Sequence, residues 1–169
     1  MSDQPVSVTR AAFPSEYGAR GAEADEPLVW EQIESRLRDS PNYWIATITP
    51  DGRPHTRPVD GVWIDGALCF GGSPETRWVR NLHDNPAVSV HLPSGDDVVI
   101  LEGSAEYVTE AGHRLAQPSA AASHAKYPQY YPGDEPPPFR PFWSFRPTVA
   151  YAWTLEGFPN RATRWTFGR

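Results

Sequence analysis

Short apolar runs and turn-forming residues alternate along most of the chain. Many of these runs alternate apolar and polar positions with a period of two, which is typical of strands that bury one face. The turn Pro50-Asp51-Gly52 and the pair Asp65-Gly66 separate successive runs, and the second is a strong signal for a two-residue hairpin. Strands at this close spacing predict an antiparallel sheet or barrel. The predicted strands cover residues 43–49, 55–64, 67–71, 87–92, 97–109, 148–155 and 162–167.

Three further segments have the pattern of helices, so the expected fold is mainly β with a few helices. In 27–39, Pro27 suits the first helical position, and three apolar residues fall on one face. Residues 75–85 predict a short helix, and 110–126, rich in alanine and serine, predict a weak one. A glycine inside a predicted strand, Gly103, indicates a bulge or a barrel corner.

A polar N-terminal stretch and an irregular internal stretch indicate how the domain is organised. Residues 1–25 are polar and predict an N-terminal arm that is ordered only if it docks on something. Residues 26–169 are expected to form a single domain, with an irregular insertion at about 110–141. Its second half, 127–141, holds six prolines and three tyrosines and predicts a long loop.

Composition and charge narrow the class of protein. The 169 residues include 19 prolines and 13 glycines, which argues against an all-helical bundle. The net charge of −6 disfavours nonspecific binding to nucleic acid or to an anionic membrane. No apolar stretch approaches the ~20 residues of a membrane span. A single cysteine, Cys69, excludes a disulfide framework, so a cytoplasmic location is expected.

The basic residues point to arginine as the ligand of any bound anion. Fourteen of the fifteen are arginines, and Lys126 is the single lysine. Arginine holds phosphate through two parallel hydrogen bonds. Any anion bound by a side-chain cation is therefore expected to be bound by arginine.

The most informative stretch runs from a predicted strand into a predicted helix, over residues 70–77. Ser73 is expected to cap the helix and Pro74 to be its first residue, and Thr76 and Arg77 follow within the first turn. A helix N-terminus offers free backbone N–H groups to an anion, and Gly71 and Gly72 would let a ligand approach the backbone. The alternative is an ordinary capped helix with a solvated arginine.

A second candidate for anion binding is Arg57, in the run Thr56-Arg57-Pro58-Val59. If its strand pairs across the hairpin with the strand that ends at Gly71, Arg57 lies close to the turn before Arg77. Two arginines and a helix N-terminus would then converge on one site for a phosphate. The alternative is a solvent-facing arginine on a strand.

In order and spacing, these motifs resemble the pyridoxamine 5′-phosphate oxidase-like superfamily of FMN-binding split β-barrels. The resemblance covers residues 43–109 well and 142–168 moderately, and it leaves out 1–25 and 110–141. The C-terminal run resembles the flavin/deazaflavin oxidoreductase branch of the superfamily. The stretches that carry the resemblance are 43–54, Arg57-Pro58-Val59, 76–82, 85–90, Leu101–Glu106 and Ala162–Phe167.

The resemblance implies an antiparallel split β-barrel that forms a homodimer with cofactor sites at its interface. Arg57 and the pair Thr76-Arg77 would hold the cofactor phosphate. The backbone along 58–62, including Pro58 and Val59, would lie against the ring system. The segment Gly71-Gly72-Ser73 would contact the ribityl chain and the phosphate region, and Trp78 is included among the cofactor-binding residues.

Two positions depart from the oxidase pattern. Where the oxidase usually has lysines, this chain has Trp78 after the helix arginine and Val62 near the end of the second strand. A less positive site argues against a phosphorylated pyridoxamine substrate and against tight FMN binding. The cofactor is therefore expected to be FMN or, alternatively, the deazaflavin coenzyme F420.

The expected function is an oxidoreductase that transfers a hydride between this cofactor and a small organic substrate. No catalytic residue can be named, and the aromatic residues Tyr127, Tyr130, Tyr131 and Trp143, with Arg164, are candidates for lining a substrate pocket or for packing. The five histidines show no metal-ligand spacing, so no metal is expected. Two alternatives remain. The first is a non-catalytic module that binds a flavin, or that binds haem with His124 as the axial ligand. The second is a dimeric barrel without a cofactor.

Overall fold

The computed structural model describes residues 4–17 and 26–168, which form a nine-stranded antiparallel sheet with three α-helices and one short 3-10 helix. The helices are η1 (Ser15–Tyr17), α1 (Trp30–Asp39), α2 (Arg77–Asp84) and α3 (Ala116–Lys126). The strands are β1 (Ser7–Arg10), β2 (Tyr43–Ile48), β3 (Pro54–Val59), β4 (Gly61–Ile64), β5 (Ala67–Phe70), β6 (Ala87–His91), β7 (Asp97–Val108), β8 (Phe142–Thr154) and β9 (Thr163–Thr166).

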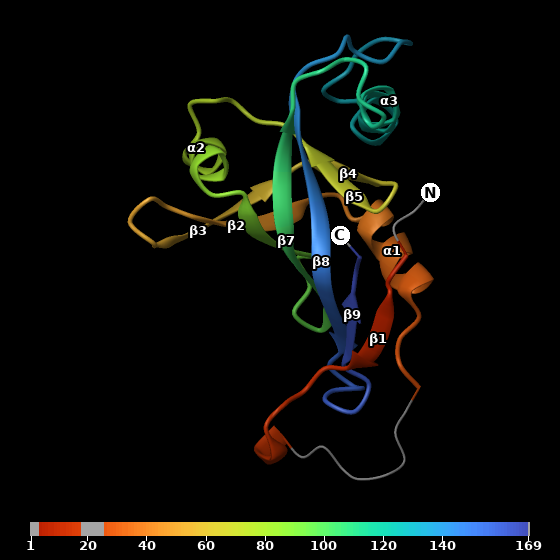
Figure 1. The fold of residues 1–169 in the computed structure, drawn as a ribbon. Helices are drawn as coiled ribbons and strands as arrows, with labels where there is room; N and C mark the ends of the chain where they lie inside the picture. Colours follow the sequence, from red (N-terminus) through yellow and green to blue (C-terminus); the bar gives the residue numbers. More distant parts are fainter. Residues whose placement is uncertain (1–3, 18–25, 169) are drawn as a thin grey trace.

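The sheet is strongly bent and does not close into a barrel by hydrogen bonds. Its main path runs β1-β9-β8-β7-β6-β2-β3, and the hairpin of β4 and β5 joins it where β5 pairs with β8. The long strands β7 and β8 form the spine of the molecule in Figure 1, with α2 and α3 at one end and α1 along one side. This mainly β architecture of the split-barrel type confirms the predicted fold class.

The predicted hairpin and bulge are both present. Asp65 and Gly66 have positive φ angles of 49° and 69°, as a two-residue hairpin turn between β4 and β5 requires. The register of β7 against β8 shifts between Glu102 and Gly103. A Cβ at Gly103 would lie 2.0 Å from the carbonyl oxygen of Arg146, so only glycine fits where these two backbones approach.

Several predicted boundaries were wrong. The strand predicted over 55–64 is two strands, because the chain leaves β3 at Asp60 and pairs next with β5 rather than with β2. The strand predicted at 148–155 begins at Phe142, so that β8 spans the full length of β7. Helix α1 begins at Trp30 rather than at Pro27, and α3 begins at Ala116.

The predicted arm lies partly on the sheet. Within it, β1 pairs with β9 from Ser7 to Arg10, and residues 18–25 lie outside the described part of the chain. All four β1 residues are exposed, so the strand adds backbone hydrogen bonds at the sheet edge rather than apolar burial. This explains why the apolar pattern of residues 1–25 gave no sign of it.

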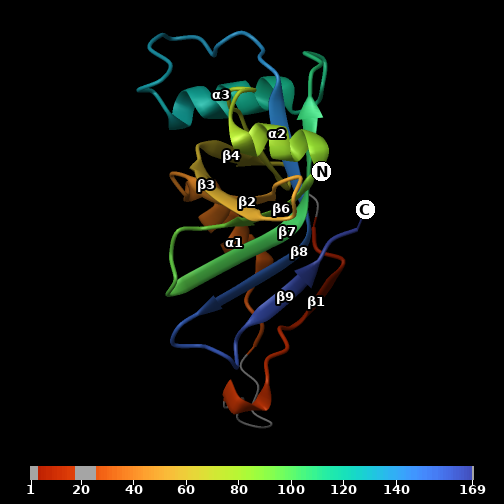
Figure 2. The ribbon, with the colours of Figure 1, turned by 90° about the vertical axis from the view of Figure 1, so that its left-hand side faces the viewer.

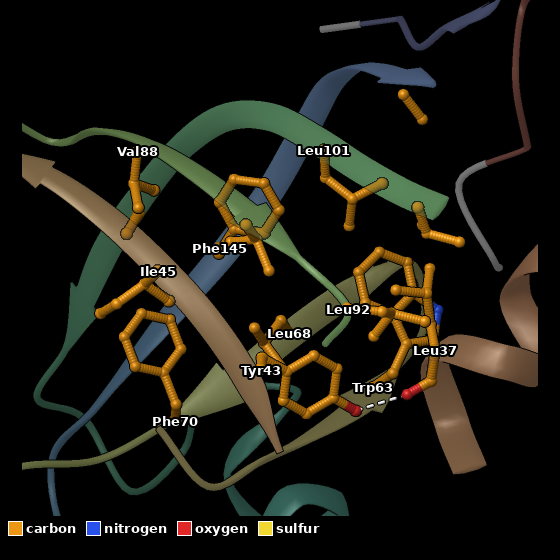
Figure 3. Packing of buried hydrophobic residues seen from close by; sticks show 14 of the residues in the cluster. Leu37, Tyr43, Ile45, Trp63, Leu68, Phe70, Val88, Leu92, Leu101 and Phe145 are labelled. Carbon is orange, nitrogen blue, oxygen red and sulfur yellow. Dashed lines mark hydrogen bonds between the residues drawn. The ribbon is translucent and has the colours of Figure 1, made fainter. Parts of the chain in front are cut away.

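The main core fills the space between the concave face of the sheet and α1. Figure 3 shows side chains from β2, β4, β5, β7 and β8 meeting α1, and the hydroxyl of Tyr43 donates a hydrogen bond to the carbonyl of Leu37. Tyr43, Leu37 and Phe145 have no exposed surface. Burying such side chains stabilises the fold by about 1.5–3 kcal/mol each.

A second, smaller core joins α3 to the β4–β5 hairpin. It contains Val62, Cys69, Leu115 and Tyr127, and Tyr131 and Phe139 of the proline-rich loop pack against it. Burial raises the pKa of the Cys69 thiol to about 12, so this cysteine is an inert small apolar side chain. The insertion at 110–141 is thus attached to the barrel by a core of its own.

Polar contacts fasten the end of α3 to the start of β4. The hydroxyl of Tyr127 accepts a hydrogen bond from the Gly61 N–H at 2.9 Å, and Lys126 Nζ donates to the Gly61 carbonyl at 2.9 Å. The ammonium also lies 5.0 Å from the centre of the Tyr43 ring. We call Lys126, Tyr127 and their contacts with Gly61 and Tyr43 the α3 clamp.

The other face of the sheet has no helix over it. In Figure 2, β7, β8 and β9 lie in front of α1 with nothing before them. Alternation along β2, β7 and β8 directs half-buried side chains to this side. We call this surface the outer face; it includes Trp44, Ile48, Ile100, Val149, Tyr151 and Trp153.

None of the helices in the described part of the chain has the length and apolar character that a membrane crossing requires.

Candidate functional site

The β2–β3 hairpin and α2 enclose a group of polar side chains. The hairpin register places Thr47 opposite His55 and Ile45 opposite Arg57, so these residues share the face that meets α2. Asn81 of α2 donates a hydrogen bond to Thr47 Oγ1 at 2.9 Å, and both side chains are buried. This bond fixes α2 against the hairpin and brings Arg77 towards His55.

His55 is buried beside two arginines. Only 8% of its surface is exposed, and its Nδ1 has no hydrogen-bond partner in the part of the chain that the structure describes. Burial, followed by the positive charges of Arg57 and Arg77, lowers the pKa of His55 below its ordinary value of 6.5. The electrostatic field at the ring is therefore positive.

Arg57 and Arg77 both act electrostatically on His55, and the strand pairing of Arg57 differs from the one expected. Arg57 pairs across β2 with Ile45, and the strand that ends near Gly71 pairs instead with β4. The expectation that Arg57 faces the 67–71 strand was wrong, because the chain bends at Asp60 between β3 and β4. Arg57 remains exposed at the sheet edge, with one guanidinium nitrogen 2.8 Å from the Thr56 carbonyl.

A pocket of about 520 Å³ lies between the hairpin turn and the side of α2. We call it the arginine pocket. Arg53 is paired with Asp51 at 2.6 Å. Hydrogen bonds from Thr49 and Arg53, with a smaller contribution from the charge of Arg77, lower the pKa of the Asp51 carboxyl. Arg80 turns back along α2 to donate a hydrogen bond to the Glu75 carbonyl. The lining residues are Thr49, Pro50, Asp51, Arg53, Pro54, His55, Arg77, Arg80, Asn81 and Asp84.

The start of α2 differs from the prediction. Ser73 was expected to cap the helix, but α2 begins at Arg77, with Thr76 at the cap position and no side-chain cap bond. Ser73 instead closes a turn in which the Thr76 N–H donates to the Ser73 carbonyl at 3.0 Å. The helix is delayed by one turn because Trp78 is buried against Phe70, with ring centres 5.6 Å apart.

The two glycines before this turn serve different purposes. A Cβ at Gly72 would lie 2.1 Å from the Trp78 ring, so glycine is needed for the indole to pack across the backbone. A Cβ at Gly71 would meet nothing within 4 Å. Gly71, Gly72 and Ser73 are all exposed, which leaves their backbone open to a ligand.

The other predicted site residues lie on both faces of the sheet. Val59 is buried in the main core, while Pro58 lies opposite Trp44 on the outer face. Trp78 belongs to the main core and Val62 to the smaller one. The two positions where the oxidase usually has lysines are therefore occupied by core residues. The cations that line the arginine pocket are all arginines.

A second cavity, of about 460 Å³, lies on the opposite side of the 71–73 segment, under α3 and the proline-rich loop. We call it the proline-loop cavity. Its walls are mainly apolar, from Phe70, Phe139 and Phe142, with Ser119 and Ser123 on the helix side and Arg140 as its single cation. Gly71, Gly72 and Ser73 also line it.

Of the residues suggested for a substrate pocket, Tyr131 lines this cavity and the other four do not. Tyr127 belongs to the α3 clamp and Trp143 to the main core. Tyr130 is 60% exposed. Arg164 pairs with Tyr151 on β8 and so lies on the outer face.

The described residues hold no cluster of histidine, cysteine and carboxylate side chains suited to a metal ion. His124, the residue considered for haem, has its Nε2 2.7 Å from the Gly133 carbonyl. That contact occupies the nitrogen that an axial ligand would use.

Sequence reasoning missed Arg53, His55 and Arg80. The histidines were expected to be surface residues or to have hydrogen-bond partners, yet His55 is buried with an unpartnered nitrogen. A signal did exist: a hairpin centred on Asp51-Gly52 pairs His55 with Thr47, and the alternation of β2 buries Thr47. Applying that register to the second strand would have predicted that His55 points to the same buried side as Thr47.

Fold and site together define a split β-barrel with an arginine-lined pocket beside its second hairpin strand. The sequence model of the pyridoxamine 5′-phosphate oxidase family matches residues 29–154, and the chain belongs to this family. A comparison with curated proteins finds no match.

Solved structures of the same fold include proteins with different ligands. The chain is similar to an F420 reductase, with 26% identity, a TM-score of 0.52, and 69% of this chain and 94% of that chain covered. A pyridoxamine 5′-phosphate oxidase-related, FMN-binding protein from Nostoc punctiforme has 21% identity, a TM-score of 0.54, and 80% and 84% coverage. The haem storage protein HutZ from Vibrio cholerae has 17% identity, a TM-score of 0.56, and 69% and 88% coverage.

Proposed function

We propose that this protein is a flavin-type oxidoreductase that binds FMN or the deazaflavin coenzyme F420 and transfers a hydride to or from a small organic substrate. The observation that carries the proposal is that Arg77 and the buried His55 line one pocket, next to the positions where the family resemblance places the cofactor phosphate. Family membership and the similarity to an F420 reductase support the same reading.

The residues present fit the phosphate end of such a cofactor. Arg57 and Arg77 are exposed guanidinium groups, and no ion pair with either is found in the described part of the chain. Arginine binds phosphate through charge-assisted hydrogen bonds. The buried His55 lines the same pocket as Arg77, and its Nδ1 has no hydrogen-bond partner among the described residues.

The remaining predicted residues would position the rest of the cofactor. The exposed backbone of Gly71, Gly72 and Ser73 leads from Arg77 towards the proline-loop cavity. When bound, the cofactor ring supplies the atom that gives or takes the hydride, and the protein supplies binding and orientation. The apolar walls of the cavity suit the exclusion of water from a small organic substrate.

The proposal includes a homodimer formed through the outer face. Half-buried aromatic and aliphatic side chains on β2, β7 and β8 form a broad surface that no helix covers (Figure 2). Glu102 and Arg164 place charges of both signs on this face, as a surface that meets a second copy of itself requires. Pro58 and Trp44 connect the outer face to β3, so a partner chain would approach the cofactor site from this side.

Spectroscopic titration tests the proposal. FMN, F420 and haem are added in turn to the purified protein, and absorption and fluorescence are followed. We expect saturable quenching of fluorescence when FMN or F420 is added. Sedimentation velocity should give a sedimentation coefficient that corresponds to two chains. No response to either flavin would refute the proposal, and a haem spectrum alone would identify the protein as a haem-binding module of the same fold.

A further inference from the structure

The arginine pocket holds more ionisable groups than the arginines that the proposed function assigns to the cofactor phosphate. It brings together Arg53, Arg77 and Arg80 with two carboxylates, Asp51 and Asp84. With a neutral His55 the lining carries a net charge of +1, from three cations and two anions, and protonation of the ring would double it to +2. The charge that this pocket offers to an anion therefore depends on one histidine.

The free protein disfavours protonation of that histidine. An imidazolium needs an acceptor for each of its two N–H groups, and Nδ1 has none among the described residues. Burial and the charges of Arg57 and Arg77 act in the same direction by lowering the pKa of His55. The groups facing the ring from α2 are Arg77 and Asn81, and the hairpin turn contributes Asp51, which is paired with Arg53.

An oxyanion in the pocket would oppose the electrostatic part of this effect. His55 and Arg77 line the same pocket, so the negative charge of the anion offsets the positive charges that act on the ring and favours its protonated form. The Thr47–Asn81 hydrogen bond holds the hairpin and α2 together, so the pocket exists before the anion arrives.

We propose that the arginine pocket is a proton-coupled oxyanion site, in which Arg77 binds the anion and His55 takes up a proton as the anion binds. The anion class is a phosphate or carboxylate group. Resting on the proposed function, we assign it to the cofactor: the phosphate of FMN or the acidic end of F420. Cofactor affinity then increases as the pH falls, because the bound state holds one more proton than the free state.

The first test uses sulfate, whose own charge does not change between about pH 5 and pH 8, where histidine titrates. The NMR signal of the His55 ring, identified by its loss in His55→Gln, is titrated in saturating sulfate and in chloride of equal ionic strength. We expect sulfate to raise the pKa of His55 and Arg77→Gln to abolish that rise. Arg161→Gln, an exposed arginine on the β8–β9 connection, is the matched control and should leave it unchanged. An equal pKa in sulfate and chloride would overturn the proposal.

Thermodynamic linkage supplies an independent check on the same site. If sulfate raises the pKa of His55 by one unit, sulfate must bind tenfold more tightly at a pH well below both pKa values than well above them, since one unit corresponds to a factor of ten. Calorimetric titration measures that ratio directly. A ratio near one would show that the sulfate followed by calorimetry binds at a site not coupled to His55, and it would overturn the assignment.

A final experiment separates this inference from the proposed function and identifies the source of the anion. FMN is compared with riboflavin, which lacks the phosphate, and F420 with its deazaflavin ring stripped of the tail. A His55 response to sulfate without binding of any flavin would refute the proposed function and leave the oxyanion site standing. Flavin binding without a His55 response to sulfate would do the reverse.

Discussion

The arginine pocket and the proline-loop cavity are nearly equal in volume, at about 520 and 460 Å³, and differ in the number of charged side chains that line them. The first is lined by three arginines, a histidine and two aspartates, and the second by phenylalanines, prolines and alanines. The segment from Gly71 to Thr76 runs between them. The contrast shows how one stretch of chain can present a charged end and an apolar end to a single elongated ligand.

The two sites also depend on the fold in different ways. The arginine pocket rests on the β2–β3 hairpin and α2, which the Thr47–Asn81 hydrogen bond joins. The proline-loop cavity rests on α3 and the loop after it, which the smaller core and the α3 clamp attach to the barrel. Substitutions can therefore disturb one site and spare the other.

The largest effect is expected from removing the guanidinium of Arg77. Arg77→Ala should weaken the binding of FMN or F420 by about 1.5–3 kcal/mol, the scale of a hydrogen bond to a charged group. Riboflavin should bind as it does to the wild type, because it has no phosphate. Fluorescence titration measures both affinities, with Arg161→Ala as the control. Equal losses for FMN and riboflavin would show that Arg77 does not contact the phosphate.

Substitutions of its two glycines test the segment from Gly71 to Thr76. In Gly72→Ala the new Cβ would meet the Trp78 ring at 2.1 Å, and displacing this buried indole should lower the free energy of unfolding by about 1–3 kcal/mol. Gly71→Ala meets nothing within 4 Å and should change stability little. Urea denaturation compares the two variants. Equal stability would mean that Trp78 is not held against Gly72.

The wall of the proline-loop cavity is tested at the α3 clamp. Tyr127→Phe removes the acceptor of the buried Gly61 N–H and should lower the free energy of unfolding by about 1–3 kcal/mol, the cost of an unsatisfied buried donor. Tyr130→Phe changes a tyrosine that is 60% exposed and should have almost no effect. Hydrogen exchange should show α3 opening more readily in the first variant while α2 keeps its protection. Loosening of α2 to the same extent would contradict the separation of the two sites.

The smallest effect concerns the pH dependence of the clamp. Burial lowers the pKa of Lys126 to about 8 from its ordinary 10.5. Between pH 8 and pH 9 the unfolded chain therefore holds more protons than the folded one, and stability should rise with pH. The ordinary pKa of cysteine is 9.0, so the raised pKa of Cys69 already opposes part of this rise near pH 9, and the raised pKa of Tyr43 opposes it at higher pH. Lys126→Met should remove the rise in urea denaturation, and a rise that persists would assign it to another group.

Patterns of neighbouring residues correctly predicted the elements whose conformation depends on those neighbours. The Asp65-Gly66 hairpin, the bulge at Gly103 and the helix before Asn85 follow from turn chemistry, close backbone approach and amphipathic spacing, and the structure confirms them. The first half of β8 escaped prediction because its fully buried run has no alternation. The break at Asp60 escaped because only the pairing of β4 with β5 reveals it.

The candidate site could be predicted in part, through Arg57 and Arg77. Their approach to His55 depends on long-range packing: α2 meets β2 and β3, which lie some thirty residues earlier. The delayed start of α2 depends on Trp78 finding Phe70 and Gly72. A capping pattern that considers only neighbouring residues cannot weigh such packing, which is why Ser73 was misassigned.

A crystal structure with the tighter-binding of FMN and F420 tests the central claim most directly. The account predicts phosphate oxygens within hydrogen-bond distance, about 2.7–3.2 Å, of the Arg57 and Arg77 guanidinium groups, with the ring system following the Gly71–Ser73 backbone. A phosphate held by Arg140 in the proline-loop cavity, with Arg57 and Arg77 left in solvent, would contradict it.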